Sequence, residues 1–214
     1  NKDSILSDVV WTIRKFKPDV IICRFPTTGE GGHGHHTASA ILAVEAFEAA
    51  ADSTRFPDQL KSTHTWQARR IFWNTFNFGS TNTTSPDQIK LDVGLFNALI
   101  GKSYGEMAAE SRSMHKSQGF GSAKGRGTTI EYFKQLKGDS VKKDLFENIE
   151  LSWNRFPITN KLTATIEAII KNFDVSYPQN SIGSLVDLYK NLKNLPEDND
   201  EVKHWKKLKL KETQ

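Results

Sequence analysis

A run of four apolar residues, Val20 to Cys23, constrains the fold of this chain more than any other feature. It follows a turn that contains a proline, at residues 17–19, and leads directly into a glycine-rich loop. A run that is apolar at every position is typical of a strand in a parallel sheet, where both faces are covered. The sequence therefore predicts an α/β fold, in which ligands gather beyond the carboxyl ends of the strands.

Helical patterns flank this predicted strand on both sides. Residues 4–16 repeat an apolar side chain every three or four positions, and Ser4 can cap the first turn. The apolar face expected for this helix consists of Ile5, Val9, Ile13 and Phe16. Residues 37–52 are rich in alanine, which favours a second helix packed closely against the sheet.

The loop between the strand and the second helix carries three histidines within four residues, His33, His35 and His36. Its glycines allow the backbone to fold tightly around a small ligand. The HxxH spacing would put His33 and His36 on one face of a regular helix. Because of the glycines, we expect only His36 on the helix, with His33 pointing in from the loop. This predicts one metal ligand and one acid-base or polarising group; the alternative is a flexible surface loop with a chance histidine cluster.

Composition narrows the classes of function. No apolar run approaches the roughly 20 residues that span a bilayer, so no membrane span is expected. The single cysteine, Cys23, excludes an internal disulfide and a multi-cysteine zinc cluster. The lysines of residues 203–211 follow the acidic residues 197–201, a pattern that complements a helix macrodipole rather than one that binds nucleic acid. The compartment is left undetermined.

The rest of the chain divides by pattern. Strands are expected at 71–76 and 89–93, a helix at 104–111, a short helix at 131–137, and longer helices at 162–173 and 182–195. We therefore predict an α/β domain over residues 1–130 and a mostly helical extension over residues 131–214.

Residues 14–22, which read RKFKPDVII, and then HGHHTA at 33–38 resemble the LmbE/PIG-L family of zinc-dependent de-N-acetylases. Members of that family show I-x-x-x-x-P-D-V-V and then H-P-D-H before a helix of small residues. The resemblance covers roughly residues 5–75. It implies that residues 1–130 are the C-terminal part of such a domain, a fragment of a Rossmann-like parallel sheet layered with helices.

The resemblance also implies roles for the histidines. His36 corresponds to a zinc ligand, and His33 to the group that polarises or protonates the reacting amide. The family takes its other two ligands and its general base from an A-H-P-D-D segment, which this sequence lacks. An N-terminal segment of the same protein is therefore expected to supply them. His35 stands where the family commonly has Asp, and Gly31 where some relatives carry an aromatic substrate contact.

A second polar concentration spans residues 111–121. Arg112, His115, Lys116 and Gln118 are candidates for the rim of a substrate site. The alternative is a solvated helix end. The resemblance as a whole implies a hydrolase that removes an N-acetyl group from an amino sugar or a related conjugate, inactive as this fragment alone. Two other hypotheses stay open: a non-catalytic relative that binds carbohydrate, and a structural segment of a larger multidomain protein.

Overall fold

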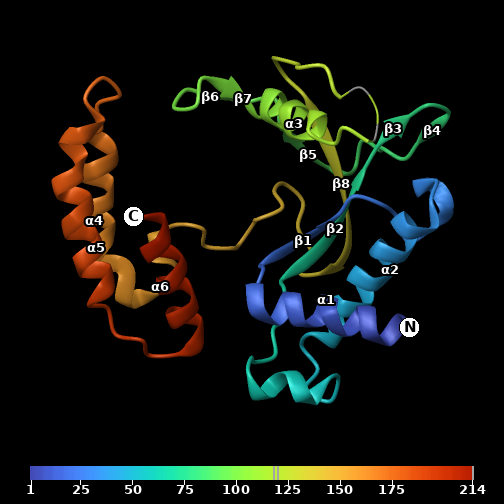
Figure 1. Cartoon of the computed structure of the whole chain (residues 1–214), viewed down its shortest axis with the longest axis horizontal. Helices are drawn as coiled ribbons and strands as arrows, with labels where there is room; N and C mark the ends of the chain where they lie inside the picture. The colour runs from blue at the N-terminus through green and yellow to red at the C-terminus, as the bar shows by residue number, and fades with distance from the viewer. Residues whose placement is uncertain (118, 120, 214) are drawn as a thin grey trace. The chain divides into compact units, whose positions relative to one another are not determined.

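The computed structural model describes residues 1–117, 119 and 121–213 and divides the chain into two compact units. Unit 1 is Asn1–Glu147 and unit 2 is Asn148–Gln214 (Figure 1). The predicted boundary at 130/131 differs from this one, because it falls at the start of a strand of unit 1. Among the described helices, none has the length and apolarity that crossing a membrane requires.

A four-stranded mixed sheet organises unit 1. Its strand order is β1-β2-β8-β5. The strands are β1 (Val20–Cys23), β2 (Arg70–Thr75), β8 (Ile130–Gly138) and β5 (Ile89–Asp92). The pair β1–β2 is parallel, with Cys23 opposite Trp73, whereas β8 pairs antiparallel with both β2 and β5. The predicted α/β class is confirmed, and the predicted strands at 20–23, 71–76 and 89–93 are found. Among the described strands, one pair is parallel and the others are antiparallel.

Strand β8 corrects the prediction of a short helix at 131–137. Charged residues such as Glu131, Lys134 and Lys137 hide its alternation in the sequence. The strand forms because it has hydrogen-bonding neighbours on both sides, from segments far away along the chain. Phe133, which points into the core, is its one buried apolar side chain among the described residues.

Two helices cover one face of the sheet, α1 (Lys2–Phe16) and α2 (Gly34–Ala49). The α2 residues Ala40 and Phe47 pack on Cys23 and Ile71, so the predicted contact between this helix and the sheet is confirmed. The predicted face of α1 is wrong apart from Ile13 and partly buried Val9, since Ile5 and Phe16 are exposed. Asn1, not Ser4, caps this helix, and the side chains buried on it are Leu6, Val10, Ile13 and Arg14.

The opposite face of the sheet is covered only in part. Residues 139–147 cover it near the amino end of β2, where buried Arg70 donates 2.8 Å hydrogen bonds to the carbonyls of Leu145 and Glu147. The core of this face consists of Phe72, Ile89, Phe133 and Leu145, with Val20 and Val141 beside them. Ile22 is 50% exposed, because β1 is an edge strand; the expectation that β1 is buried on both faces is therefore wrong.

The remaining elements of unit 1 are short. A 3-10 turn η2 (Pro57–Lys61) follows α2, and two small hairpins precede the predicted helix α3 (Tyr104–Ser113). The hairpin strands are β3 (Asn77–Phe78), β4 (Thr81–Asn82), β6 (Phe96–Asn97) and β7 (Lys102–Ser103). A capping box between Ser103 and Glu106 begins α3.

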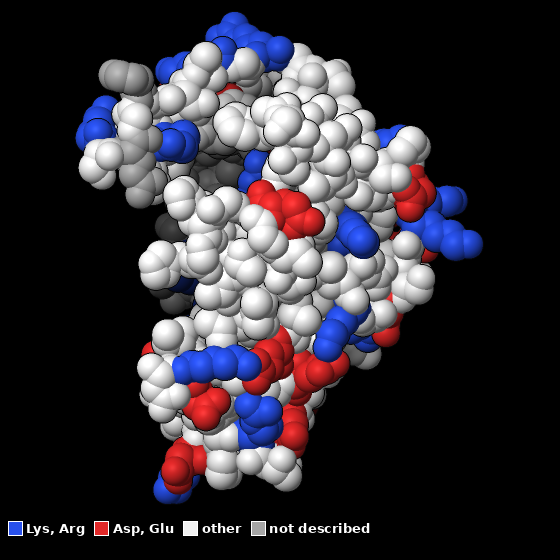
Figure 2. All heavy atoms as spheres, turned by 90° about the vertical axis from the view of Figure 1, so that its right-hand side faces the viewer, with Lys and Arg blue, Asp and Glu red and all other residues white. Residues whose placement is uncertain are grey.

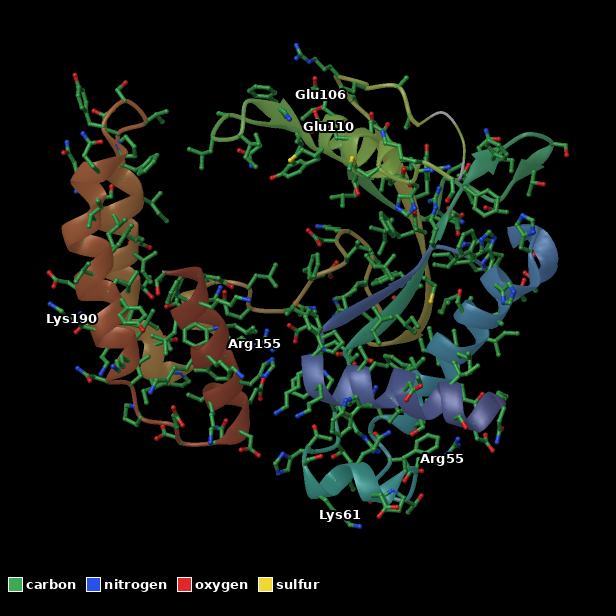
Figure 3. The ribbon with its side chains drawn as sticks, viewed as in Figure 1. Arg55, Lys61, Glu106, Glu110, Arg155 and Lys190 are labelled. Carbon is green, nitrogen blue, oxygen red and sulfur yellow. The ribbon has the colours of Figure 1, made fainter. Side chains whose placement is uncertain are left out.

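Unit 2 is helical, as predicted for this part of the extension. Its helices are α4 (Asn160–Lys171), α5 (Ile182–Lys193) and α6 (Asp200–Glu212), with 3-10 turns η3 (Trp153–Arg155), η4 (Pro157–Thr159) and η5 (Pro178–Ser181). Trp205 of α6 lies in the core, edge-on to Trp153 at 5.4 Å between ring centroids. Arg155 donates to Glu201 at 3.3 Å; Figure 3 labels this arginine. The acidic start and basic end of α6 follow the expected macrodipole pattern.

Candidate functional site

The glycine-rich loop leaves the carboxyl end of β1 and returns as the first turn of α2. A 3-10 turn η1 (Gly29–Gly31) lies within it and ends at Gly32, whose φ of 81° favours glycine. A Cβ at Gly31 would meet the Cβ of His36 at 3.3 Å and the ring of Phe25 at 3.4 Å. The loop therefore uses its glycines for a turn and for close packing around one histidine.

His36 is held on two sides. Its Nδ1 lies 2.8 Å from the carbonyl oxygen of Gly31, and its ring stacks on Phe25 with centroids 3.7 Å apart and planes 2° from parallel. A carbonyl accepts a hydrogen bond, so the contact assigns the proton to Nδ1. This tautomer leaves the lone pair on Nε2, on the other side of the ring, and so gives His36 one oriented ligand atom.

His33 stands at the N-cap of α2 with an extended backbone, and its side chain makes no capping hydrogen bond. Its ring meets His36 edge-on, with centroids 5.1 Å apart. His35 lies in the first turn and is exposed. His36 thus lies on the helix and His33 at its N-cap on the loop side, with their rings as neighbours, and the division into a ligand and an acid-base group stays a prediction.

The sequence reasoning missed a polar cluster beside this loop. Arg24, the first residue after β1, donates through Nη1 to the side-chain oxygen of Asn74 in β2. Asn74 donates at 2.7 Å to Glu131 in β8, and Arg24 Nη1 lies 3.7 Å from the same carboxylate. Polar residues at the carboxyl ends of β1 and β2 were a usable signal. Glu131 was lost because its strand was predicted as a helix.

Trp73, the neighbour of Asn74 in β2, carries a further unused group. Its indole Nε1 is buried and has no hydrogen-bond partner among the described residues. Buried donors without a partner are rare, and they concentrate at sites where a water, an ion or a ligand completes the structure. The carboxyl end of β2 therefore carries Asn74, whose polar atoms have hydrogen-bond partners, next to the Trp73 indole, which has none among the described residues.

The three other predicted site residues lie at the end of α3. Arg112 is in its last turn, and His115 and Lys116 are exposed residues of the turn that follows. Within the described residues, the hydrogen bonds of His115 and Lys116 are backbone contacts inside this turn, to Arg112 and Met114. These contacts do not bring His115 or Lys116 to the histidine loop. Gln118 lies outside the described residues.

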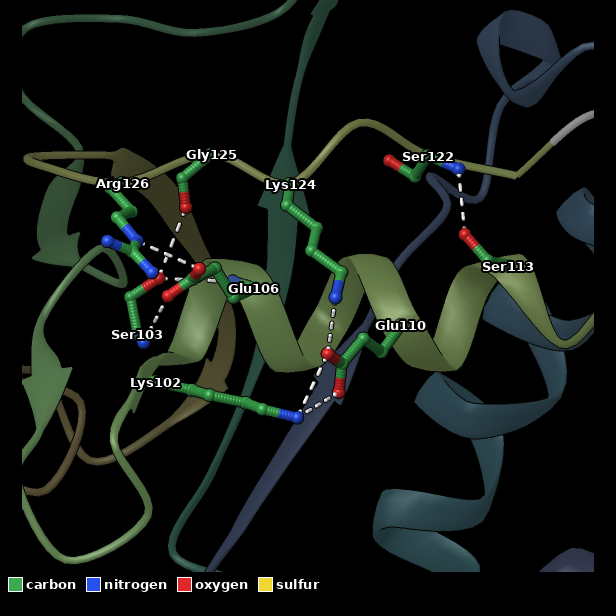
Figure 4. Close-up of polar contacts among 9 residues, drawn as sticks. All are labelled: Lys102, Ser103, Glu106, Glu110, Ser113, Ser122, Lys124, Gly125 and Arg126. Carbon is green, nitrogen blue, oxygen red and sulfur yellow. Dashed lines mark hydrogen bonds and ion pairs between the residues drawn. The ribbon is translucent and has the colours of Figure 1, made fainter.

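An ion-pair network ties the segment after this turn back onto α3 (Figure 4). Glu110 accepts from Lys102 at 2.8 Å and from Lys124 at 2.6 Å, and Glu106 accepts from Arg126 at 2.8 Å. The two lysines lower the pKa of Glu110 to about 2. Both carboxylates belong to one helix, as Figure 3 also shows, and they are occupied by structural partners. This network therefore positions residues 122–126. Its two carboxylates already pair with cationic side chains, so neither is a candidate metal ligand.

Charged side chains are present at the histidine loop: Glu30 lies within it, and Arg24 begins it and pairs with Glu131. Figure 2 views unit 1 from the side of α2 and the β3–β4 hairpin: acidic and basic side chains mix toward the lower end of this face, basic ones lie at its upper end, and its middle shows an acidic group with a basic side chain beside it. Across the part of the chain that the structure describes, no group of three or more His, Cys, Asp and Glu residues is placed to hold a metal ion. The described residues thus provide one oriented imidazole and a second beside it.

Comparisons with protein-family models, with curated proteins and with solved structures find no match for this chain. The geometry of the loop and its neighbours is therefore the basis for the functional argument.

Proposed function

We propose that this chain is part of a zinc-dependent hydrolase that removes an N-acetyl group from an amino sugar or a related conjugate. In this proposal unit 1 is part of a Rossmann-like domain, His36 is a zinc ligand and His33 acts on the reacting amide. The observation that carries the proposal is the double restraint on the His36 ring, by the Gly31 carbonyl and by Phe25.

His36 fits a zinc ion as one ligand. Metal-binding histidines almost always donate their second ring nitrogen to a carbonyl or a carboxylate, which fixes the tautomer and the direction of the ring. The 2.8 Å contact of Nδ1 with Gly31 is such an interaction. A catalytic zinc site needs three protein ligands, and by this proposal the others come from an N-terminal segment of the intact protein, as does the general base.

Zinc, when bound, acts as a Lewis acid and lowers the pKa of water. The chain's own residues supply orientation and a proton. His33 is exposed at the N-cap, beside the His36 ring and not stacked on it, so its imidazole is free to turn toward a substrate. There it can donate a hydrogen bond to the amide oxygen as negative charge develops, or a proton to the leaving amine. Arg112, His115 and Lys116 stay candidates for the substrate rim.

Metal binding tests the ligand role of His36. We expect His36→Ala to weaken zinc binding, measured by metal analysis and competition with a chelator, in the intact protein. His35→Ala is the matched control, because it removes a neighbouring exposed imidazole whose side chain makes no hydrogen bond to another described residue. Equal zinc content in His36→Ala and in the wild type would refute the assignment.

Turnover tests His33. We expect His33→Ala to retain zinc while hydrolysis of an N-acetylated amino sugar slows roughly 100-fold or more, the scale of losing one group that stabilises a transition state. His35→Ala again serves as the control. Unchanged turnover in His33→Ala would remove it from the mechanism. Retained binding of the sugar without any turnover in the wild type would support the non-catalytic alternative.

A further inference from the structure

The cluster of Arg24, Asn74 and Glu131 crosses three neighbouring strands. Asn74 lies in β2, Glu131 lies in the neighbouring strand β8, and Arg24 directly follows β1, the neighbour of β2 on its other side. Asn74 is opposite Phe133 in the sheet. Because side chains alternate along a strand, residues two apart share a face. The cluster therefore belongs to the incompletely covered face of Phe72 and Phe133, not to the face under α2.

Asn74 is the fixed centre of the cluster. It is 9% exposed, its oxygen accepts from Arg24, and its amide nitrogen donates to Glu131 at 2.7 Å and to the carbonyl of Tyr132 at 3.2 Å. Every polar atom of this side chain thus has a partner. Asn74 is part of the sheet, and its hydrogen bonds hold the side chains of Arg24 and Glu131 in place.

Arg24 and Glu131 keep their outer atoms available. Their side chains are 55% and 34% exposed. Within the described residues, Nε and Nη2 of Arg24 and Oε1 of Glu131 have no hydrogen-bond partner. Half-exposed Ile22 precedes Arg24 by two residues on the same edge strand, and Leu91, 43% exposed, is opposite Glu131 in β5. Donors and an acceptor are thus presented next to apolar surface.

The charges decide what kind of ligand this arrangement suits. An isolated arginine would attract a phosphate or a carboxylate, but Glu131 lies 3.7 Å from its guanidinium and repels such anions. A neutral ligand that both accepts and donates hydrogen bonds avoids this repulsion. Adjacent hydroxyl groups on a sugar have this property, since each hydroxyl is a donor and an acceptor.

We propose that Arg24 and Glu131, held by Asn74, form a subsite that binds neighbouring hydroxyl groups of a neutral sugar. The cluster and the histidine loop both lie at the carboxyl end of β1: Arg24 follows this strand directly, and the next residue, Phe25, is the ring that stacks on His36. The choice of a sugar as ligand rests on the proposed function. The arrangement of the Arg24 donors beside the Glu131 acceptor does not rest on it, and sugar binding there can be tested without zinc.

The test is a titration of the full chain, in the presence of a chelator, with N-acetylglucosamine and separately with inorganic phosphate, followed by ¹H–¹⁵N NMR. We expect the sugar to shift the resonances of Arg24, Asn74 and Glu131. Arg24→Ala and Glu131→Gln should each weaken its binding about tenfold or more, the loss of at least one hydrogen bond to a charged group. Arg24→Lys, which keeps the charge and loses the planar fork, should also weaken binding.

Arg69→Ala is the matched control. Arg69 forms a 2.9 Å ion pair with Asp139 at the other end of β2, and its side chain is 52% exposed, close to the value for Arg24. Its removal should leave sugar binding unchanged, and folding of each variant is checked by its NMR spectrum. Sugar binding that is absent in the wild type, or equal in the wild type and Arg24→Ala, would overturn the proposal. So would phosphate binding that strengthens in Glu131→Gln while the sugar shifts nothing.

These outcomes separate the two proposals. If Arg24→Ala loses sugar binding while His36→Ala binds zinc as the wild type does, the sugar subsite is supported and the hydrolase proposal is refuted. If His36→Ala loses zinc while Arg24→Ala binds the sugar as the wild type does, the role of His36 as a zinc ligand is supported and the sugar subsite is refuted.

Discussion

The two ends of α2 are built in opposite ways. Arg14 of α1 saturates the carboxyl end, whereas the amino end carries three histidines and no side-chain cap. One helix thus has an end devoted to stability and an end whose polar groups are left open. The difference teaches where function can lie on this scaffold, since ligand sites need groups that the fold itself has not used.

Arg14 is completely buried, and its five N–H groups have six acceptors within hydrogen-bond distance, five of them backbone carbonyls, so that one N–H of Nη2 is shared. The acceptors are the carbonyls of Ala49, Ala50, Asp52, Arg55 and Phe56 and the side chain of Gln59. Burial lowers the pKa of Arg14, and the nearby Asp52 opposes that shift. The last carbonyls of a helix lack partners within it, so this one side chain completes the end of α2 and fastens the following turn to α1.

The first test breaks the saturated end, and we expect it to have the largest effect. Arg14→Met should lower the free energy of unfolding by at least about 3 kcal/mol, because five carbonyls lose a charged donor at once, although those of Ala50, Asp52 and Phe56 each keep a backbone donor. Urea unfolding measures the loss. Cys23 gives a second readout: it is 6% exposed under α2, and burial raises the pKa of its thiol to about 11, so a thiol reagent reaches it mainly after opening.

Arg55→Met is the control for this change. The Arg55 side chain is 41% exposed and pairs with Glu45 at 3.6 Å, so it should contribute little. Figure 3 labels Arg55 near α1. If the two variants unfold at the same urea concentration and label Cys23 at the same rate, the saturated end is not what stabilises α2.

The contrast also explains which features the sequence could predict. Strands β1 and β5, the amphipathic and alanine-rich helices, and the separation of His33 from His36 follow from patterns within a few residues. Arg14 was invisible in its role, because its acceptors lie 35 to 45 residues further along the chain. Strand β8 and the contact of Asn74 with Glu131, 57 residues apart, likewise exist only once the sheet has formed. Local periodicity fixes elements, whereas a buried charge or a central polar strand depends on its distant partners.

The second test loosens the open end without removing a histidine. Phe25→Leu keeps an apolar side chain but removes the ring stacked on His36 at 3.7 Å. If that ring orients the ligand nitrogen, zinc affinity of the intact protein should fall about 10- to 100-fold, the usual cost of losing a group that orients a ligand. Phe78→Leu is the control, since Phe78 is 83% exposed in the β3–β4 hairpin. An affinity equal to that of the control would show that the Gly31 carbonyl alone orients His36.

The third test closes the open end, and its expected effect is the smallest. His33 has the extended N-cap conformation without a capping side chain, so His33→Asp should supply a side-chain acceptor for the backbone amides at the start of α2. We expect stability to rise by about 1 kcal/mol in urea unfolding. Hydrolysis should fall as in His33→Ala, because a carboxylate cannot donate to a developing oxyanion at neutral pH.

The control for this gain is His35→Asp, which places the same charge in the first turn, where it gains from the helix macrodipole but not from the N-cap geometry. The difference between the two variants is therefore the capping hydrogen bond itself. A stability gain in His33→Asp that does not exceed that of His35→Asp would mean that the open end carries no unused capping position. In that case His33 does not lower the free energy of unfolding relative to a capping residue. The two ends of α2 would then differ only in how exposed their polar groups are.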